Sequence, residues 1–155
     1  MTYLRWGFSI LLLLIVLGVF LAPLGPLPGF FIGGTKAEPP GAWPDTTATH
    51  EVRLGIPGTP PRVVIIWVVQ VAGELHVVGA PDSGWVQMLG QGGPVELRIG
   101  DNTYPLTARR VTEGWEPILQ AYVTKYEPDY PEIIAGFPPL EEAEGQFALF
   151  RLERG

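Results

Sequence analysis

The sequence feature that most limits the fold is an apolar run followed at once by a turn and a second strand. Residues 63–69 are all apolar and rich in β-branched side chains, which is typical of a central strand covered on both faces. A hairpin turn at residues 72–73 follows. On the next strand His76 faces away from Leu75 and Val77. We expect any ligand site to lie where this second strand passes into the following helix.

A chain of 155 residues has room for one domain of ordinary size and an appendage. The formal net charge is -6, and the ten Lys and Arg form no basic patch. We therefore expect no nucleic-acid partner. The absence of cysteine excludes disulfides, thiolate metal ligands and cysteine nucleophiles, and the two histidines lack metal-binding spacing, so we expect no metal site. Seventeen prolines and twenty glycines favour many turns and a β-rich fold.

The N-terminal region carries a segment without charge, residues 6–22, dominated by Leu, Ile and Val. As a helix it would be about 25 Å long, near the lower limit for crossing a bilayer. We predict a retained transmembrane anchor over residues 1–32, in contact with membrane lipid through residues 6–22, because no good signal-peptide cleavage site follows. Arg5 precedes the segment and only Lys36 follows it closely. This places the N-terminus in the cytoplasm and the domain outside the cell membrane, as a single-pass protein.

After the anchor we expect a Pro/Gly-rich linker at residues 33–47, extended along the surface, and then a folded domain at residues 48–155. Alternating apolar and polar residues predict about six strands joined by short antiparallel connections, with two or three inserted helices. The clearest helix has an apolar stripe formed by Trp115, Ile118, Leu119, Tyr122, Val123 and Tyr126. The fold class is thus mainly β with inserted helices, either a small barrel or a strongly curved sheet.

Four stretches, taken in this order, resemble a known family: Ile66–Val69, Gly73–Val78, Ser83–Trp85 and Val95–Tyr104. They are similar to the FMN-binding split-barrel superfamily, in particular the branch of deazaflavin-dependent nitroreductases and pyridoxamine phosphate oxidase-like proteins. The likeness covers about residues 48–152. It implies a six-stranded split β-barrel, usually a homodimer, that holds FMN or a deazaflavin at the barrel rim near the subunit boundary.

In that family the second strand and the loop after it hold the phosphate of the cofactor, commonly through a basic residue and a Ser or Thr. The residues of this chain onto which the site carries over are His76, Gly79, Ser83, Trp85 and Arg109. Gly79 would permit close backbone approach, and the helix N-terminus together with Arg109 or Arg110 would compensate the negative charge of Asp82. The chain departs from the family because the strand and loop carry no Arg or Lys.

Three of these candidates also have an ordinary structural explanation. His76 could be a partly buried histidine satisfied by the backbone, Ser83 could cap a helix, and Trp85 could pack in the core. Two functions therefore stay open, besides a purely structural or assembly role for the anchor and its domain. One is a membrane-anchored flavin or deazaflavin oxidoreductase, in which the cofactor transfers hydride. The other is a non-catalytic, membrane-tethered barrel that binds a small apolar ligand or a partner protein.

Overall fold

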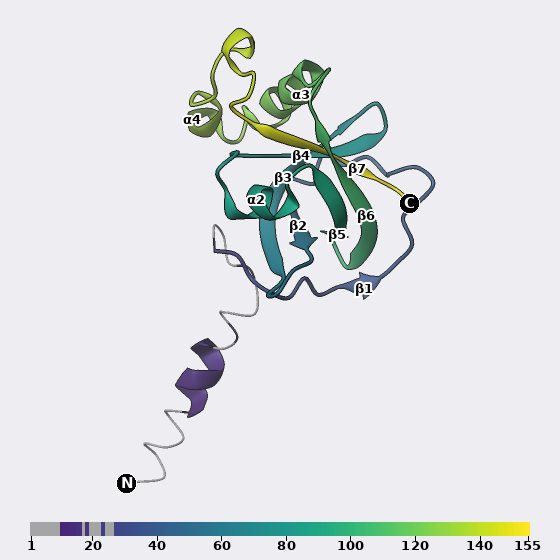
Figure 1. Cartoon of the computed structure of the whole chain (residues 1–155), viewed down its shortest axis with the longest axis vertical. Coiled ribbons are helices and arrows are strands. Elements are labelled where there is room, and N and C mark those ends of the chain that lie inside the picture. Colours follow the sequence, from purple (N-terminus) through teal and green to yellow (C-terminus); the bar gives the residue numbers. More distant parts are fainter. Residues whose placement is uncertain (1–9, 17, 19–22, 24–26) are drawn as a thin grey trace.

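The computed structural model describes residues 10–16, 18, 23 and 27–155. Its elements are β1 (Thr35–Lys36), β2 (Glu51–Ile56), β3 (Arg62–Val71), β4 (Glu74–Gly79), α2 (Gly84–Leu89), β5 (Gly92–Ile99), β6 (Asn102–Val111), α3 (Glu116–Tyr126), α4 (Pro131–Ile134), a 3-10 turn (Leu140–Glu142) and β7 (Ala148–Glu153). The strands form a strongly curved sheet, with α3 and α4 on one side of it (Figure 1).

Six strands close into an antiparallel barrel in the order β6-β5-β2-β3-β4-β7, and β7 pairs back with β6. Each of the six therefore has a neighbour on both sides, which leaves no long exposed edge. The predicted six-stranded barrel is confirmed. The short strand β1, which the sequence did not predict, pairs in parallel with the start of β6 from outside the barrel.

The barrel is filled by the inward-facing residues of its strands, of which Leu54, Val68, Leu75, Val77, Leu97, Phe150 and Leu152 are fully buried. A tryptophan closes each end. Trp85 of α2 lies beside Gly79, at the end where β4 finishes, and Trp43 lies beside Tyr104, near the start of β6. A second apolar cluster forms outside the barrel, where α3 packs on β3. The buried side chains of α3 are Ile118, Leu119, Tyr122 and Tyr126, as the apolar stripe predicts.

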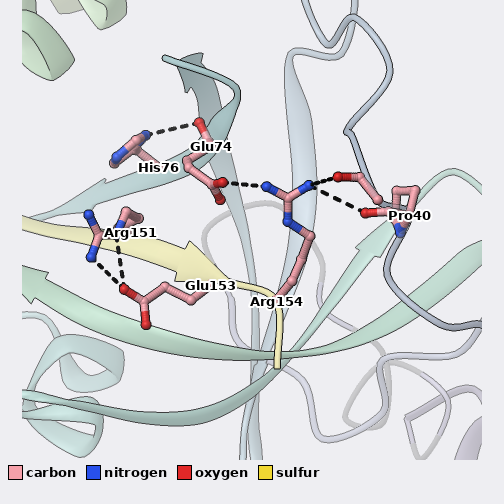
Figure 2. Close-up of polar contacts among 7 residues, drawn as sticks. Pro40, Glu74, His76, Arg151, Glu153 and Arg154 are labelled. Carbon is pink, nitrogen blue, oxygen red and sulfur yellow. Dashed lines mark hydrogen bonds and ion pairs between the residues drawn. The ribbon is translucent and has the colours of Figure 1, made fainter.

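Residues 29–43, which we call the strap, run extended along the barrel and overlap the linker predicted at residues 33–47. Trp43 is only 6% exposed and its ring meets Tyr104 edge to face at 5.2 Å. The backbone of the strap is bound to the barrel along its length. Arg154 donates to the Gly41 carbonyl at 2.6 Å and also contacts Glu74 and the carbonyl of Pro40 (Figure 2). Proline and glycine predict the extended course of this segment, and the barrel residues that bind it lie far away in the sequence.

The predicted membrane segment is described only in part. Residues 10–16 and 18 are helical, and the large apolar side chains of residues 10–16 are all exposed, by between 44% and 64%. This helix extends away from the barrel (Figure 1). Residues 6–9, 17 and 19–22 of the predicted anchor lie outside the described residues. Within the described part of the chain, no helix has both the length and the apolar character needed to span a bilayer.

Candidate functional site

Strand β3 changes partners halfway along its length. Residues 62–67 pair with β2, whereas residues 68–71 pair with β4. The first half of β3 and the last residues of β4 are therefore not joined by a ladder, although the barrel closes on either side of them. We call this opening the split.

A tyrosine hydroxyl takes the next position in the β2–β3 ladder. The last β2–β3 pair is Glu51 with Trp67, so that His50 would next face Val68. Instead, the hydroxyl of Tyr126 accepts the N–H of Val68 at 2.9 Å and donates to the His50 carbonyl at 2.6 Å. Burial raises the pKa of Tyr126, so the hydroxyl keeps its proton and remains a donor.

Tyr122, one helical turn earlier on α3, does the same on the other side of β3. The β3–β4 ladder ends at Val68 with Val77, so that Trp67 would next face Val78. The Tyr122 hydroxyl donates to the Trp67 carbonyl at 2.7 Å and accepts the N–H of Val78 at 3.1 Å. Burial raises the pKa of Tyr122 well above its usual range. The two hydroxyls thus satisfy the backbone groups that the split would otherwise leave unpaired.

The split opens into an apolar groove of about 370 Å³. Its floor is the first half of β3 and the end of β4, and α3, α4 and the chain before β7 form its walls. The lining residues are Ile65, Ile66, Trp67, Val78, Gly79, Ala80, Tyr122, Ile133, Phe137 and Phe147. Phe137 and Phe147 pack on each other with ring centroids 5.0 Å apart. Four aromatic side chains around one groove make a surface suited to a flat ring.

The backbone of β3 offers hydrogen bonds to this groove. Alternate residues of a strand direct their N–H and C=O groups to the same edge. Val63 exchanges two bonds of 2.8 Å with Gly29, and the Trp67 carbonyl is bound by Tyr122. Ile65 lies midway between Val63 and Trp67, so both of its backbone groups point into the split. They are the donor and acceptor that the groove can present to a ligand.

Gly79 and Trp85 lie together at the rim, but with different roles. A Cβ on residue 79 would lie 2.3 Å from the Trp85 ring, so only glycine lets the indole pack there. Trp85 is 6% exposed, and its ring lies 5.6 Å from that of Phe150 inside the barrel. Its place is in the core, while Gly79 lines the groove itself.

Ser83 lies in the loop that follows the groove. Its hydroxyl donates to the Ala80 carbonyl at 2.8 Å and does not cap α2. The flat guanidinium of Arg62 lies over the next residue, since a Cβ on Gly84 would be 3.0 to 3.1 Å from its central carbon and both terminal nitrogens. The Arg62 Nε is buried without a hydrogen-bond partner, and no ion pair of Arg62 is found among the described residues.

Arg62 is therefore the cation that the sequence analysis did not find beside this loop. Arg62 is the first residue of β3. In the sequence, the β3–β4 hairpin separates it from the loop that contains Ser83. No local motif marks it, because a lone Arg after Pro60 and Pro61 resembles any strand start. The signal that could have found it is indirect: in a barrel, the start of β3 and the end of its antiparallel neighbour β4 lie at the same end.

The other two candidates lie away from the groove. Arg109 points outward from β6, is 66% exposed and is ion-paired with Glu153. His76 is on the outer face of β4 opposite Arg151, 5% exposed, with its Nδ1 3.1 Å from the Glu74 carbonyl (Figure 2). Burial and the nearby Arg151 lower the pKa of His76. The structure thus brings Gly79 and Ser83 to one end of the groove and leaves His76 and Arg109 on a different surface.

A closed six-stranded antiparallel barrel with this opening is a fold of the split-barrel type. Among solved structures, the chain is similar to HutZ, the heme storage protein from Vibrio cholerae, with 20% identity over 70% of this chain and 84% of that chain and a TM-score of 0.50. It is also similar to a NimC/NimA family protein from Clostridium acetobutylicum, with 16% identity over 66% and 73% of the two chains and a TM-score of 0.48. At these identities the likeness concerns the fold.

No protein-family model matches the chain, and no curated protein sequence matches it. The described residues contain no group of three or more His, Cys, Asp or Glu side chains arranged to hold a metal ion. The groove and the loop beside it are therefore the features from which a function can be argued.

Proposed function

We propose that this protein binds FMN or a deazaflavin, with the ring in the groove of the split and the phosphate at Arg62 and Ser83. The observation that carries the proposal is the unpartnered guanidinium of Arg62 at the loop that ends the apolar groove. The buried Arg62 Nε has no hydrogen-bond acceptor among the described residues, and a buried polar atom without one is costly. An aromatic groove that ends at such a cation suits a flat ring bearing a phosphate.

The residues present fit both parts of such a cofactor. Aromatic walls can hold the ring, and the N–H and C=O of Ile65 can pair with the imide edge of a flavin. Arg62 can form charge-assisted hydrogen bonds to a phosphate, with the Ser83 hydroxyl beside it. Once bound, the cofactor would supply hydride transfer, while the chain orients the ring and excludes water from it. The protein would then be an oxidoreductase.

The proposal is tested at Arg62. We expect full-length protein in detergent to lose tryptophan fluorescence on titration with FMN, and Arg62→Gln to weaken FMN binding by about 10- to 100-fold, because a charge-assisted hydrogen bond contributes about 1.5 to 3 kcal/mol. Riboflavin, which has no phosphate, should bind both proteins equally well. Arg109→Gln is the matched control and should bind FMN like the wild type. Failure of the wild type to bind FMN or a deazaflavin refutes the proposal.

A second function is favoured by the apolar lining of the groove, in which the Tyr122 hydroxyl is already bonded on both sides. In this case the barrel binds a small apolar ligand, or a partner protein, without catalysis. A fluorescent apolar probe would then bind in the groove and FMN would not displace it. Because the solved structure of HutZ is that of a heme storage protein, hemin belongs among the ligands tested; the groove lining has no His, Cys or Met to ligate its iron.

We also propose that residues 6–22 anchor the protein in the cell membrane, with the barrel outside the cytoplasm and paired as a homodimer. The support is that no charged residue occurs between Arg5 and Lys36, and that the apolar side chains of residues 10–16 are exposed. Resistance to alkaline extraction tests the anchor, and a reporter fused after Gly155 tests its orientation. Sedimentation of the detergent-solubilised protein at the mass of one chain would exclude the dimer.

A further inference from the structure

The strap holds the chain that follows the apolar segment in one fixed position. Arg53 and Arg98, which are partners across β2 and β5, both donate to the Ile32 carbonyl, at 3.4 and 3.1 Å. The Thr103 hydroxyl donates to the Gly33 carbonyl at 2.6 Å. Together with the two bonds between Gly29 and β3, these contacts leave no flexible linker between residue 29 and the barrel.

Several exposed large apolar side chains lie at this junction. Leu27 is 61% exposed, Phe30 43%, Phe31 65% and, on α2, Met88 43%. Among the described residues, the other exposed large apolar side chains are those of residues 10–16 and Ile133. The two phenylalanines are exposed although they follow Gly29, whose backbone is bonded to β3.

One uncharged loop joins these side chains into a single surface. Residues 57–61 contain three prolines and no charge, and all five are exposed. Phe30, Phe31, Pro57 and Pro61 line a common hollow. A Cβ on Gly58 would lie 2.8 Å from the Met88 Cε, so the same loop also touches Met88. The surface therefore runs from the strap across the loop to α2, at the end of the barrel where β2 finishes and β3 begins.

We propose that this surface, formed by Leu27, Phe30, Phe31, residues 57–61 and Met88, lies in the interfacial region of the lipid bilayer. The proposal rests on the membrane anchor proposed above and adds a fixed orientation of the barrel to it. Lipid is the occupant that fits, because the surface continues an apolar stretch that has no charge from residue 6 to residue 35. Aromatic side chains are enriched at this depth of a membrane. The rigid strap holds them there together with the barrel end.

The absence of cysteine makes this orientation directly measurable. Single nitroxide labels are placed at Phe31→Cys and Met88→Cys in the full chain, reconstituted into phosphatidylcholine vesicles. Leu13→Cys serves as the lipid reference. Gln120→Cys, exposed on α3 on the side of the barrel away from the N-terminal helix (Figure 1), serves as the water reference. We expect the ratio of oxygen to nickel-complex accessibility at positions 31 and 88 to be several-fold higher than at position 120, and to approach that at position 13.

The other outcomes overturn the proposal in distinguishable ways. If the labels at positions 31 and 88 match the label at position 120 while the label at position 13 is in lipid, the anchor stands and the docking is wrong. If position 13 also reads water, both are wrong. Low accessibility of positions 31 and 88 to both reagents would show a protein contact instead of lipid. FMN titration of the same vesicles tests ligand binding in the groove independently of membrane docking. With the label at position 88, the double variant Phe30→Ser, Phe31→Ser should shift the accessibility ratio of that label toward the value in water.

Discussion

The two ends of the barrel are each closed by a tryptophan, but the two closures have different origins. Trp85 comes from α2, which directly follows β4, and it packs against Gly79 of that same strand. Trp43 comes from the strap, far from the strand residue that it meets, Tyr104. Both indoles are 6% exposed. The two tryptophans are equally buried, but Trp85 follows its neighbouring strand directly in the chain, whereas Trp43 comes from a distant segment.

Trp43 and Trp85 also differ in the hydrogen bonding of the indole N–H and in the parts of the molecule that surround each ring. The indole N–H of Trp43 is buried without a hydrogen-bond partner, which costs free energy that apolar contacts must offset. Trp85 adjoins the groove through Gly79 and the proposed lipid-facing surface through its helix. The closure made by α2 therefore separates the barrel core from the proposed ligand site, whereas the closure made by the strap joins the N-terminal chain to the barrel.

The largest expected effect distinguishes the two tryptophans by removing each of them. Trp85→Ala should lower the free energy of unfolding by about 3 to 5 kcal/mol, the usual range for a buried tryptophan. Trp43→Ala should cost about 1 to 3 kcal/mol less, because it also removes an unpaired buried N–H. Urea unfolding of the full chain in detergent measures both. If both variants lose the same free energy of unfolding, the two tryptophans stabilise the barrel equally and the unpaired N–H of Trp43 has no measurable cost. In that case Trp43→Phe and Trp85→Phe should also be equally destabilised.

A smaller effect is expected at Gly79, on which only one of the two closures depends. Gly79→Ala places a Cβ 2.3 Å from the Trp85 ring, and overpacking of this kind costs about 1 to 3 kcal/mol. Gly41→Ala, in the strap beside the other closure, is the control, since no atom lies within 4 Å of its Cβ. In a Trp85→Leu background the cost of Gly79→Ala should shrink, as measured by a double-mutant cycle.

The smallest effect is a pH dependence near the strap-closed end, on the outer face of β4. Burial lowers the pKa of His76 in the folded chain, so the unfolded chain, with a pKa of about 6.5, takes up the proton first. His76 therefore leaves stability unchanged above this pH and reduces it as the pH falls below 6.5, until the folded pKa is passed. The difference in urea midpoint between wild type and His76→Gln, followed from pH 8 to pH 5, isolates this contribution. A constant difference would contradict it.

Much of the fold was predictable because its signals are local. The apolar run of β3, the turn at residues 72–73 and the apolar stripe of α3 each depend on neighbouring residues. Of the candidate site residues, Gly79 lines the groove, and Ser83 lies in the loop after it, bonded to the Ala80 carbonyl. Arg62 was not, because its place beside Gly84 depends on how β3 and α2 meet across the barrel.

The sequence by itself determined a mainly β domain, the number of its barrel strands, the helix that packs on it and an uncharged N-terminal segment, since side-chain period and turn residues act over a few positions. The tertiary structure alone decided that β3 changes partners, that two tyrosine hydroxyls fill the interrupted ladders and that a proline-rich segment closes the barrel. These features depend on pairings between residues distant in the chain. Such pairings are selected by the packing of the whole barrel, and no local pattern encodes them.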